Sequence, residues 1–591
     1  MVYNTHSGAK RPDALHRTDG AGGCAFDGVV KMPLRASIFT PGIIRCSGAK
    51  RPDALHRTDG AGGCAFDGVV KISLQANIFT PGVICTRPIF LQKVHGFASM
   101  RSAHHWARIC RRSAVADREI IIIRRLLKRE RSEKMNIHSE SAVKDLTVGN
   151  PYSVIVTFAL PIFLSQVFQQ LYNTADTFIV GKFLGTDAFA AVSSSGTLIF
   201  LLVSFFNGTA MGAGVVISRY FGAGNRDCVC RAVHTNIALG ITGGLILTVF
   251  GVVFTPTLLV WMNTDPDVLP QAVEYFRYYF SGALAMIMYN VCCGIMNAVG
   301  DSERPLYYLI FSSLLNVLLD LIFVAVFRWG VWSAAIATVI SQASSVVLCF
   351  IHLTKKGHIF TVELKKIKFH GDMLKQIIRF GLPSGVQNSV IGLANVIVQT
   401  NINSFGKFAT AAYGAHAKIE GFAFLPITSF NMAITTFIGQ NLGAKLYDRA
   451  KTGARFGILS AVIMAQIIGI IYYIFAESFI GFFDSSPEVV ALGAQQAHTA
   501  TLFYFLLAYS HAVAAVCRGA GKAFVPMLVM LSVWCVLRIG YIELVMSLFG
   551  KIEYIYWAYP LTWAISSVIY FIYYHASDWI HGFEKKREKT L

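Results

Sequence analysis

The chain has 591 residues, of which 54% are hydrophobic and only 14% charged, and its formal net charge is +19. This composition excludes an ordinary soluble domain and indicates a protein with many membrane spans. Residues 1–134 contain 23 Lys and Arg against 10 Asp and Glu, whereas the rest of the chain contains 29 against 23. Most of the positive charge therefore lies outside the apolar part, residues 150–580, and we expect no nucleic-acid partner.

The basic N-terminal part contains a duplication with a period of 40 residues. The sequence SGAKRPDALHRTDGAGGCAFDGVVK occurs at 7–31 and again, unchanged, at 47–71. Repeats that stack into a fold share an apolar pattern and vary at the surface, and these do neither. We expect residues 1–134 to be an extension that is either disordered or upstream of the real start, Met135. The apolar stretch 120–123 is too short for a secretory signal.

From Asn150 onward the sequence contains twelve apolar stretches, each long enough to form a helix that crosses a membrane. They centre near residues 168, 200, 243, 285, 316, 342, 390, 425, 465, 503, 536 and 563. The even-numbered loops and the two ends carry 22 Lys and Arg, whereas the odd-numbered loops carry 4. Because basic loops stay preferentially on the cytoplasmic side, we predict that both termini are cytoplasmic.

The first six stretches and the last six resemble each other. Leu160-Pro161 matches Leu382-Pro383 at an offset of 222 residues, and Gly300 matches Gly521 at an offset of 221. We therefore predict an all-α polytopic membrane protein built from two six-helix bundles related by a parallel pseudo-twofold repeat, which is an architecture of alternating-access carriers. The predicted parts are an extension (1–134), an N-terminal bundle (135–353), a cytoplasmic linker (354–379), a C-terminal bundle (380–580) and a cytoplasmic tail (581–591).

Polar residues recur along the first stretch at intervals of three or four. Gln166, Gln169, Asn173 and Asp176 share one face of the predicted helix, and the other faces are apolar. An ionised carboxylate in hydrocarbon costs about 2.5–3.5 kcal/mol on insertion scales, so it is rare without a partner or a function. We predict that Gln166, Gln169 and Asn173 line a polar cavity beside Asp176.

The fifth stretch carries a similar pair, Asn316 and Asp320, four residues apart and therefore on one helical face. Counted from the outer loops, Asp176, Asp320 and Thr338 lie roughly 9, 12 and 15 Å below the outer edge of the membrane. These oxygen-bearing side chains predict a site for a coupling cation or proton. The alternatives are that the aspartates are structural hydrogen-bonding anchors and that Thr338 bonds its own backbone.

The second half carries other intramembrane charges. Lys418 and Glu420 lie 11 and 13 residues inside Lys407, and Arg538 lies 12 residues after Pro526. The same counting places all three charged residues near mid-membrane. We predict an ion pair between Arg538 and Glu420, with either a structural role or a substrate contact.

Several other kinds of chemistry have no sequence support. The twelve cysteines form no CxxC pair, so neither a disulfide framework nor a metal site is predicted. The Walker motif GxxxxGK[ST] is missing, so we expect no ATP-driven transport. We also expect no cofactor and no enzymatic activity, and we expect the protein to act as a monomer.

Seven motifs together resemble the multidrug and toxic compound extrusion (MATE) family, of the bacterial NorM and DinF types. The resemblance covers residues 145–580. The motifs are LPIFLSQVFQQLYNTADTFIVGKFLG, SRYFGAGNRD, NAVGDSERP, NVLLDLIFV, GLPSGVQNSV, IGQNLGAK and CRGAGKAFVPM.

This resemblance implies two six-helix bundles in a bacterial cell membrane that export small organic, often cationic, compounds in exchange for H+ or Na+. Asp176, Asn316 and Asp320 match the cation site of relatives, with Thr338 beside it. The seventh and tenth stretches lack the acidic residues of NorM-type members, so the site is expected in the N-terminal half alone.

Two alternatives from other classes stay open. A lipid-linked saccharide flippase of the same superfamily would share the two bundles but would need a larger basic cavity for a pyrophosphate group. A membrane-embedded enzyme would need a nucleophile and a base close together, and the first half places no His, Ser or Cys within helical reach of a buried carboxylate.

Overall fold

The computed structural model describes residues 144–261, 266–355 and 361–581, all within one compact unit, Ala107–Leu591. The predicted extension 1–134, the proposed start at Met135 and nearly all of the predicted tail 581–591 lie outside these residues. The regular elements within the described ranges are all helical. The all-α prediction is therefore confirmed.

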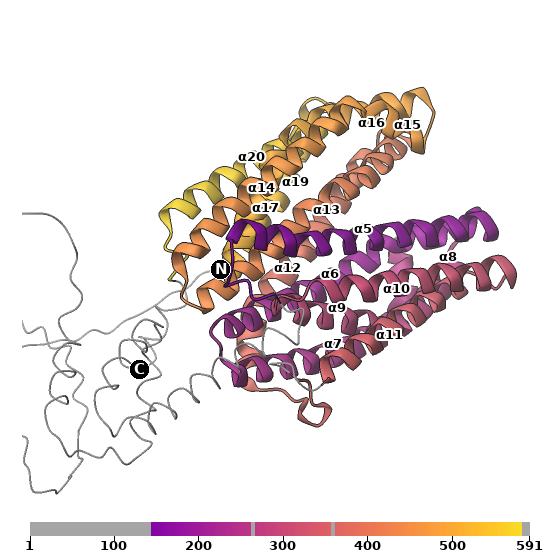
Figure 1. Cartoon of the computed structure of the whole chain (residues 1–591). Coiled ribbons are helices and arrows are strands. Elements are labelled where there is room, and N and C mark those ends of the chain that lie inside the picture. The colour runs from indigo at the N-terminus through magenta and orange to yellow at the C-terminus, as the bar shows by residue number, and fades with distance from the viewer. Residues whose placement is uncertain (1–143, 262–265, 356–360, 582–591) are drawn as a thin grey trace, which may run out of the picture. The chain divides into compact units, whose positions relative to one another are not determined.

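The first half of the described chain forms a bundle of helices, drawn in purple to red in Figure 1. Its elements are α5 (Pro151–Leu184), α6 (Thr186–Gly222), α7 (Arg226–Trp261), α8 (Leu269–Ser281), α9 (Ala283–Ala298), α10 (Glu303–Asp320), the π-helical segment η3 (Leu321–Val326) and α11 (Trp332–Thr354).

The second half forms another bundle, drawn in orange to yellow, after a short 3-10 turn, η4 (Leu364–Lys366). Its elements are α12 (Gly371–Asn403), α13 (Lys407–Gly443), α14 (Tyr447–Ile474), α15 (Ala476–Phe483), α16 (Pro487–Ala500), η5 (Thr501–Phe503), α17 (Tyr504–Gly519), α18 (Phe524–Met530), the π-helical segment η6 (Leu531–Leu537), α19 (Arg538–Leu548) and α20 (Ile552–Ala576). Helix α12 begins at Gly371, before the predicted end of the linker at residue 379.

Each of the twelve predicted centres falls in one of these helices or in a short helical break between two of them. By length and composition, nine helical segments of the described part could cross a membrane, and the pair α8 and α9, bent by 47°, makes a tenth if the two helices form one span. Helix α12 has 33 residues and is long enough, but it is not among those nine.

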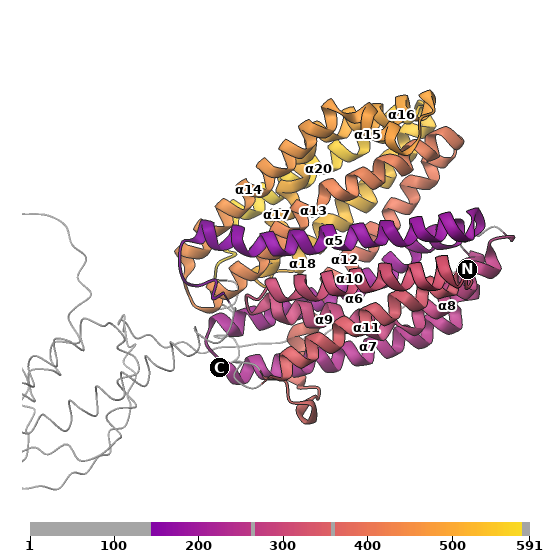
Figure 2. The ribbon, with the colours of Figure 1, turned by 45° about the vertical axis from the view of Figure 1, so that its right-hand side comes forward.

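Glycines bring α6 and α12 into close contact. Gly208 and Gly212 of α6 lie directly against the backbones of Gly385 and Gly381 of α12, with no room for a side chain between them. Small residues allow helices in a membrane to approach closely. The two helices therefore cover each other's faces rather than exposing them to lipid, and this contact joins the two bundles (Figure 2).

The predicted repeat is visible in the backbone. Gly185, at φ 94°, joins α5 to α6, and Gly406, at φ 96°, lies between α12 and α13. These two glycines are 221 residues apart, the spacing that relates the halves. Because side chains rarely adopt such a positive φ, the same tight outer turn requires glycine in both halves.

A segment before α5, residues 144–149, ties the two bundles together. The backbone N–H of Lys144 donates to Gly300 O (3.3 Å) in the first bundle. The buried Leu146 donates its N–H to Gln440 Oε1 (3.1 Å) in the second. Arg449 of α14 donates to three carbonyls of the same segment at 2.5–3.1 Å. The segment therefore closes the end of the molecule that is predicted to face the cytoplasm.

We expect Arg449→Gln to loosen this closure. The change removes a charged donor from three carbonyls. Each charge-assisted hydrogen bond contributes about 1.5–3 kcal/mol to the stability of the closed segment. Amides of residues 144–149 should exchange hydrogen about tenfold faster or more, measured by mass spectrometry. Lys451→Gln, which removes an exposed charge from the same helix, is the control. Unchanged exchange in Arg449→Gln would mean that the other contacts, from Gln440, Asn441 and Gly300, hold the segment without Arg449.

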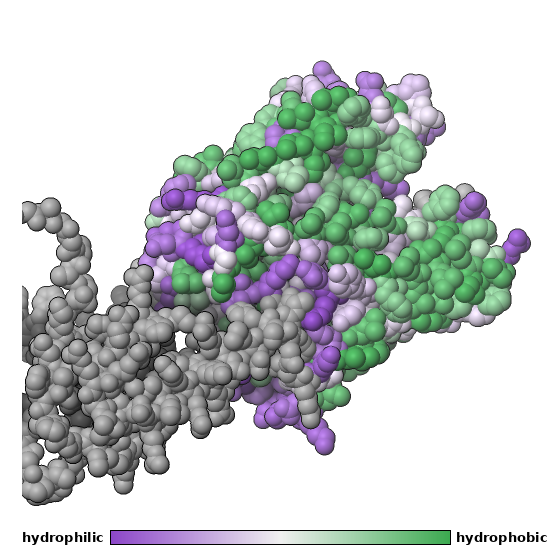
Figure 3. Space-filling model, in the orientation of Figure 1, coloured by the Kyte–Doolittle hydropathy of each residue, from purple (hydrophilic) through white to green (hydrophobic). Residues whose placement is uncertain are grey.

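The surface of the two bundles fits a lipid environment. Figure 3 shows broad hydrophobic areas over both bundles, with hydrophilic residues gathered toward the end that carries segment 144–149. Large apolar side chains such as Val249, Leu314, Ile351 and Phe571 are more than half exposed. Such contiguous apolar exposure is not found on soluble monomers and is expected for lipid-facing helices.

Candidate functional site

The candidate site lies inside the first bundle, where α5, α10 and α11 meet. Of the predicted residues, Asn316 and Asp320 of α10 are 1% and 0% exposed, and Asp176 of α5 and Thr338 of α11 are each 8% exposed. Asp176 and Asp320 are in electrostatic range of each other. The structure thus brings all four predicted coupling residues into one buried region.

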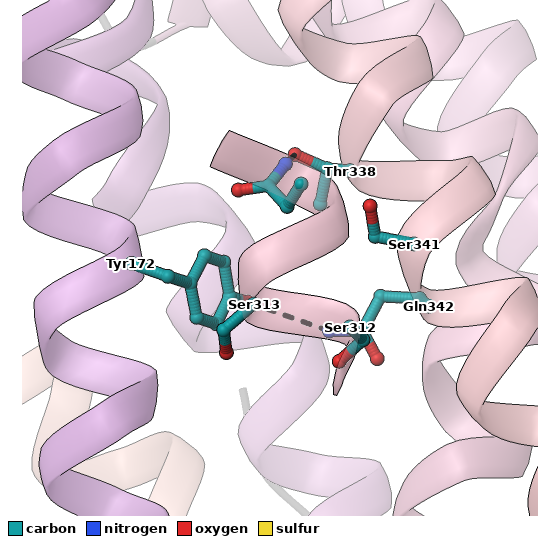
Figure 4. A pocket seen from close by; sticks show the side chains of 7 residues that line it. Tyr172, Ser312, Ser313, Thr338, Ser341 and Gln342 are labelled. Carbon is teal, nitrogen blue, oxygen red and sulfur yellow. Dashed lines mark hydrogen bonds between the residues drawn. The ribbon is translucent and has the colours of Figure 1, made fainter. Parts of the chain in front are cut away.

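A narrow gap, too small to hold a water molecule, lies beside Asn316 and Thr338. Figure 4 shows the ring of Tyr172 pointing from α5 toward Ser313, with Thr338, Ser341 and Gln342 on the facing helix. Gln342 Nε2 donates to the Tyr172 hydroxyl at 3.4 Å. Each lining side chain therefore carries a hydroxyl or an amide group.

Oxygen atoms in this region outnumber the donors available to them. Among the described residues, Asp176 Oδ1, Asn316 Oδ1 and both carboxylate oxygens of Asp320 are buried and accept no hydrogen bond. Asn316 uses its Nδ2 to donate to Thr338 Oγ1 at 3.4 Å. No basic side chain of the described part acts on either carboxylate. Two buried carboxylates without a counter-ion require a proton or a cation between them.

Thr338 fits both interpretations that its sequence allowed. Its hydroxyl donates to Ala334 O at 3.1 Å, which is the hydrogen bond to the helix backbone that the structural alternative predicted. The same oxygen also accepts from Asn316. Thr338 therefore orients Asn316 so that the Asn316 carbonyl oxygen stays free for a ligand.

The predicted polar cavity along α5 is only partly correct. Gln166 faces the second bundle, where it accepts from Thr428 Oγ1 and donates to Met432 Sδ (3.8 Å). Gln169 and Asn173 are exposed. Helix α5 packs against α10 of the first bundle and α13 of the second, so its polar face meets different neighbours. Gln166 contacts Thr428 of α13, whereas Gln169 interacts with the Tyr172 hydroxyl beside the candidate site.

Five lining residues were not predicted: Tyr172, Ser312, Ser313, Ser341 and Gln342. A signal for them existed. Each lies three or four residues from a predicted site residue on the same helix, so extending the helical period by one turn would have found them.

The ion pair predicted between Glu420 and Arg538 does not form in the described part of the second bundle. Among the ion pairs of the described residues there is none between Glu420 and Arg538, and Arg538 instead donates to Thr562. Glu420 is only in electrostatic range. Lys418 is exposed, with its Nζ 5.6 Å from the Phe483 ring centroid, so it is not a buried charge. Its long stem lets the ammonium group reach a polar environment.

A family model described as MatE matches residues 161–322 and 383–542, which is more than half of the chain. This chain is a member of the MATE family. The two matched blocks start 222 residues apart, in agreement with the duplication found in the sequence and in the backbone turns. The MATE family is one of multidrug efflux transporters of the membrane, and the predicted resemblance is confirmed.

Similar proteins cover nearly the whole helical part. The probable multidrug resistance protein YoeA of Bacillus subtilis is 28% identical over 427 residues, which cover 71% of this chain and 92% of that protein. The probable multidrug resistance protein NorM of Thermotoga maritima is 25% identical over 388 residues, covering 64% and 82%.

A solved structure supports the fold independently. The outward-facing conformation of a multidrug resistance MATE family transporter has a TM-score of 0.70 to this chain, at 21% identity, covering 75% of this chain and 99% of that one. The MATE fold of two helical bundles, predicted from the sequence, is therefore confirmed. The matched proteins are transporters.

Proposed function

We propose that this MATE protein is a secondary antiporter that exports small organic compounds while H+ or Na+ enters and binds at Asp176, Asn316 and Asp320. The observation that carries the proposal is the set of buried oxygens on these residues that accept no hydrogen bond in the described structure. Hard cations prefer such oxygen ligands, and a proton on one carboxylate would relieve the same electrostatic conflict.

Coupling follows from competition. If ion binding and compound binding weaken each other by a common factor, ion entry from outside promotes release of the compound outside, because linkage is reciprocal. The two bundles meet at the contact between α6 and α12 and at segment 144–149, and alternating access requires that this interface rearrange. The excess of Lys and Arg in the even-numbered loops supports cytoplasmic termini.

The test uses the full chain in proteoliposomes that contain a cationic dye. We expect dye movement under an inward pH gradient or an inward Na+ gradient, each imposed alone, and no stimulation by ATP. Dye movement that requires ATP, or that ignores both gradients, would contradict ion-coupled antiport.

The flippase alternative has less support. Arg277 and Lys418, two of the cations that could have bound a pyrophosphate, are exposed, and Arg538 alone of the three is buried. A single guanidinium does not make a large basic cavity.

A further inference from the structure

Arg538 is a buried cation whose hydrogen-bonding capacity is largely unused. The side chain is 1% exposed at the start of α19. Its Nε and Nη2 both donate to one oxygen, Thr562 Oγ1, at 3.2 and 2.8 Å. The rings of Trp534 and Tyr559 lie 5.0 and 4.6 Å from the guanidinium carbon. A guanidinium has five N–H donors, so one hydroxyl and two aromatic faces satisfy it only in part.

The positive charge also has no direct counter-ion. Within the described residues the groups in electrostatic range of Arg538 are Tyr559, Tyr413, Glu420 and Cys535, and only Glu420 is a carboxylate. Glu420 makes no ion pair with Arg538 within the described structure. Arginine stays charged in proteins, so burial without a contacting anion is costly. An arrangement of this kind is expected where an anion binds during function.

The internal repeat shows which position Arg538 occupies. Arg538 follows Asn316 by 222 residues, and Thr562 follows Thr338 by 224. In the first bundle Asn316 donates to Thr338, and in the second Arg538 donates to Thr562. The two hydrogen bonds therefore join corresponding helices of the repeat, α10 with α11 and α19 with α20, and the pair in the first bundle belongs to the candidate ion site.

The carboxylates of the first bundle have no acidic counterparts in the second. At the two offsets of the repeat, 221 and 222 residues, Asp176 corresponds to Ile397 or Val398, and Asp320 corresponds to Tyr541 or Ile542. Val398 and Ile542 are 0% and 1% exposed. The second bundle thus replaces two acids and an amide by one guanidinium, which reverses the sign of the site.

From these observations we infer that Arg538 binds an anionic group, a carboxylate or a phosphate, on a transported compound. The carrier would then accept organic anions and zwitterions as well as cations. Tyr413 is partly exposed, and its hydroxyl lies 3.1 Å from that of Tyr559, whose ring faces the Arg538 guanidinium. The π-helical segment η6 ends directly before Arg538, and such segments often accompany functional sites. The inference rests on the proposed transport function.

The test compares two dyes that differ in one group. Rhodamine B carries a carboxylate, and its ethyl ester keeps the cationic ring system without it. Binding of each dye to the purified full chain in detergent is measured by fluorescence anisotropy. The parent protein should bind rhodamine B more tightly than the ester. Arg538→Gln should raise the Kd of rhodamine B about tenfold or more and change that of the ester about twofold or less.

Two further variants make the result specific. Glu420→Gln removes the one carboxylate in range of Arg538, so rhodamine B should bind more tightly. Lys418→Gln removes an exposed charge from the same helix and should change neither Kd. Equal affinity of the parent for both dyes, no binding of rhodamine B, or equal weakening of both dyes by Arg538→Gln would each overturn the inference. If Arg538→Gln does not fold, the parent and Glu420→Gln decide.

Failure of this inference is distinguishable from failure of the proposed function. Binding in detergent needs no gradient, so a carrier without ion coupling would still show the preference for the acid. Conversely, ion-driven dye export together with equal binding of acid and ester would refute the role of Arg538 alone.

Discussion

Asp176→Asn should reduce gradient-driven dye export to the rate of empty liposomes while leaving the protein folded. Asparagine has nearly the same shape as aspartate, so the packing between α5 and α10 should survive. Asparagine carries no charge and cannot take up a proton. The site would therefore keep one carboxylate, that of Asp320, next to the unpaired oxygen of Asn316. The measurement is dye movement under a pH gradient and, separately, a Na+ gradient.

The control removes the same charge from a place where it has no such role. Asp448→Asn changes a fully exposed aspartate at the start of α14 and should transport like the parent. Asp320→Asn should fall nearly as far as Asp176→Asn. If Asp176→Asn exports dye like the parent under both gradients, the ion site is assigned to the wrong residues.

Much of the fold could be predicted because a membrane imposes strong constraints on sequence. Apolar stretches of about 20 residues must be helices, since backbone groups have no other partners in hydrocarbon. Repeated motifs then revealed the two halves. The breaks at η3 and η6 and the bend between α8 and α9 were not predicted. The bend falls at Ser281–Gly282, and Gly/Ser pairs of this kind are sites of sharp kinks, so the sequence did carry a signal for it.

The site was predictable where burial of a charge is itself the signal. Asp176, Asn316 and Asp320 are rare residue types in hydrocarbon, and the structure places them together. Glu420 and Arg538 gave the same signal, but depth alone cannot tell which way a side chain points around its helix. Arg538 turns toward Thr562 of α20, so the predicted pair does not form.

The contact between α6 and α12 predicts a second large effect, in Gly212→Ala. A methyl group at Gly212 would overlap the backbone nitrogen and Cα of Gly381, and a helix backbone cannot move aside as a flexible side chain can. Overpacking of this kind costs about 1–3 kcal/mol. Because this contact joins the bundles, we expect a lower Tm of the purified protein and a loss of dye export in proteoliposomes.

Gly214→Ala provides a matched control two residues away on the same helix. The nearest atoms to its new methyl group would be Gly294 O at 3.9 Å and the Ala298 Cβ at 4.0 Å, which is ordinary contact. Alanine favours a helix over glycine by about 1 kcal/mol, so Gly214→Ala should keep or raise the Tm. The two substitutions change the same atoms in the same helix, so opposite shifts in Tm can arise only from the approach of α12. A Tm of Gly212→Ala equal to that of Gly214→Ala would show that the bundles do not meet at this glycine.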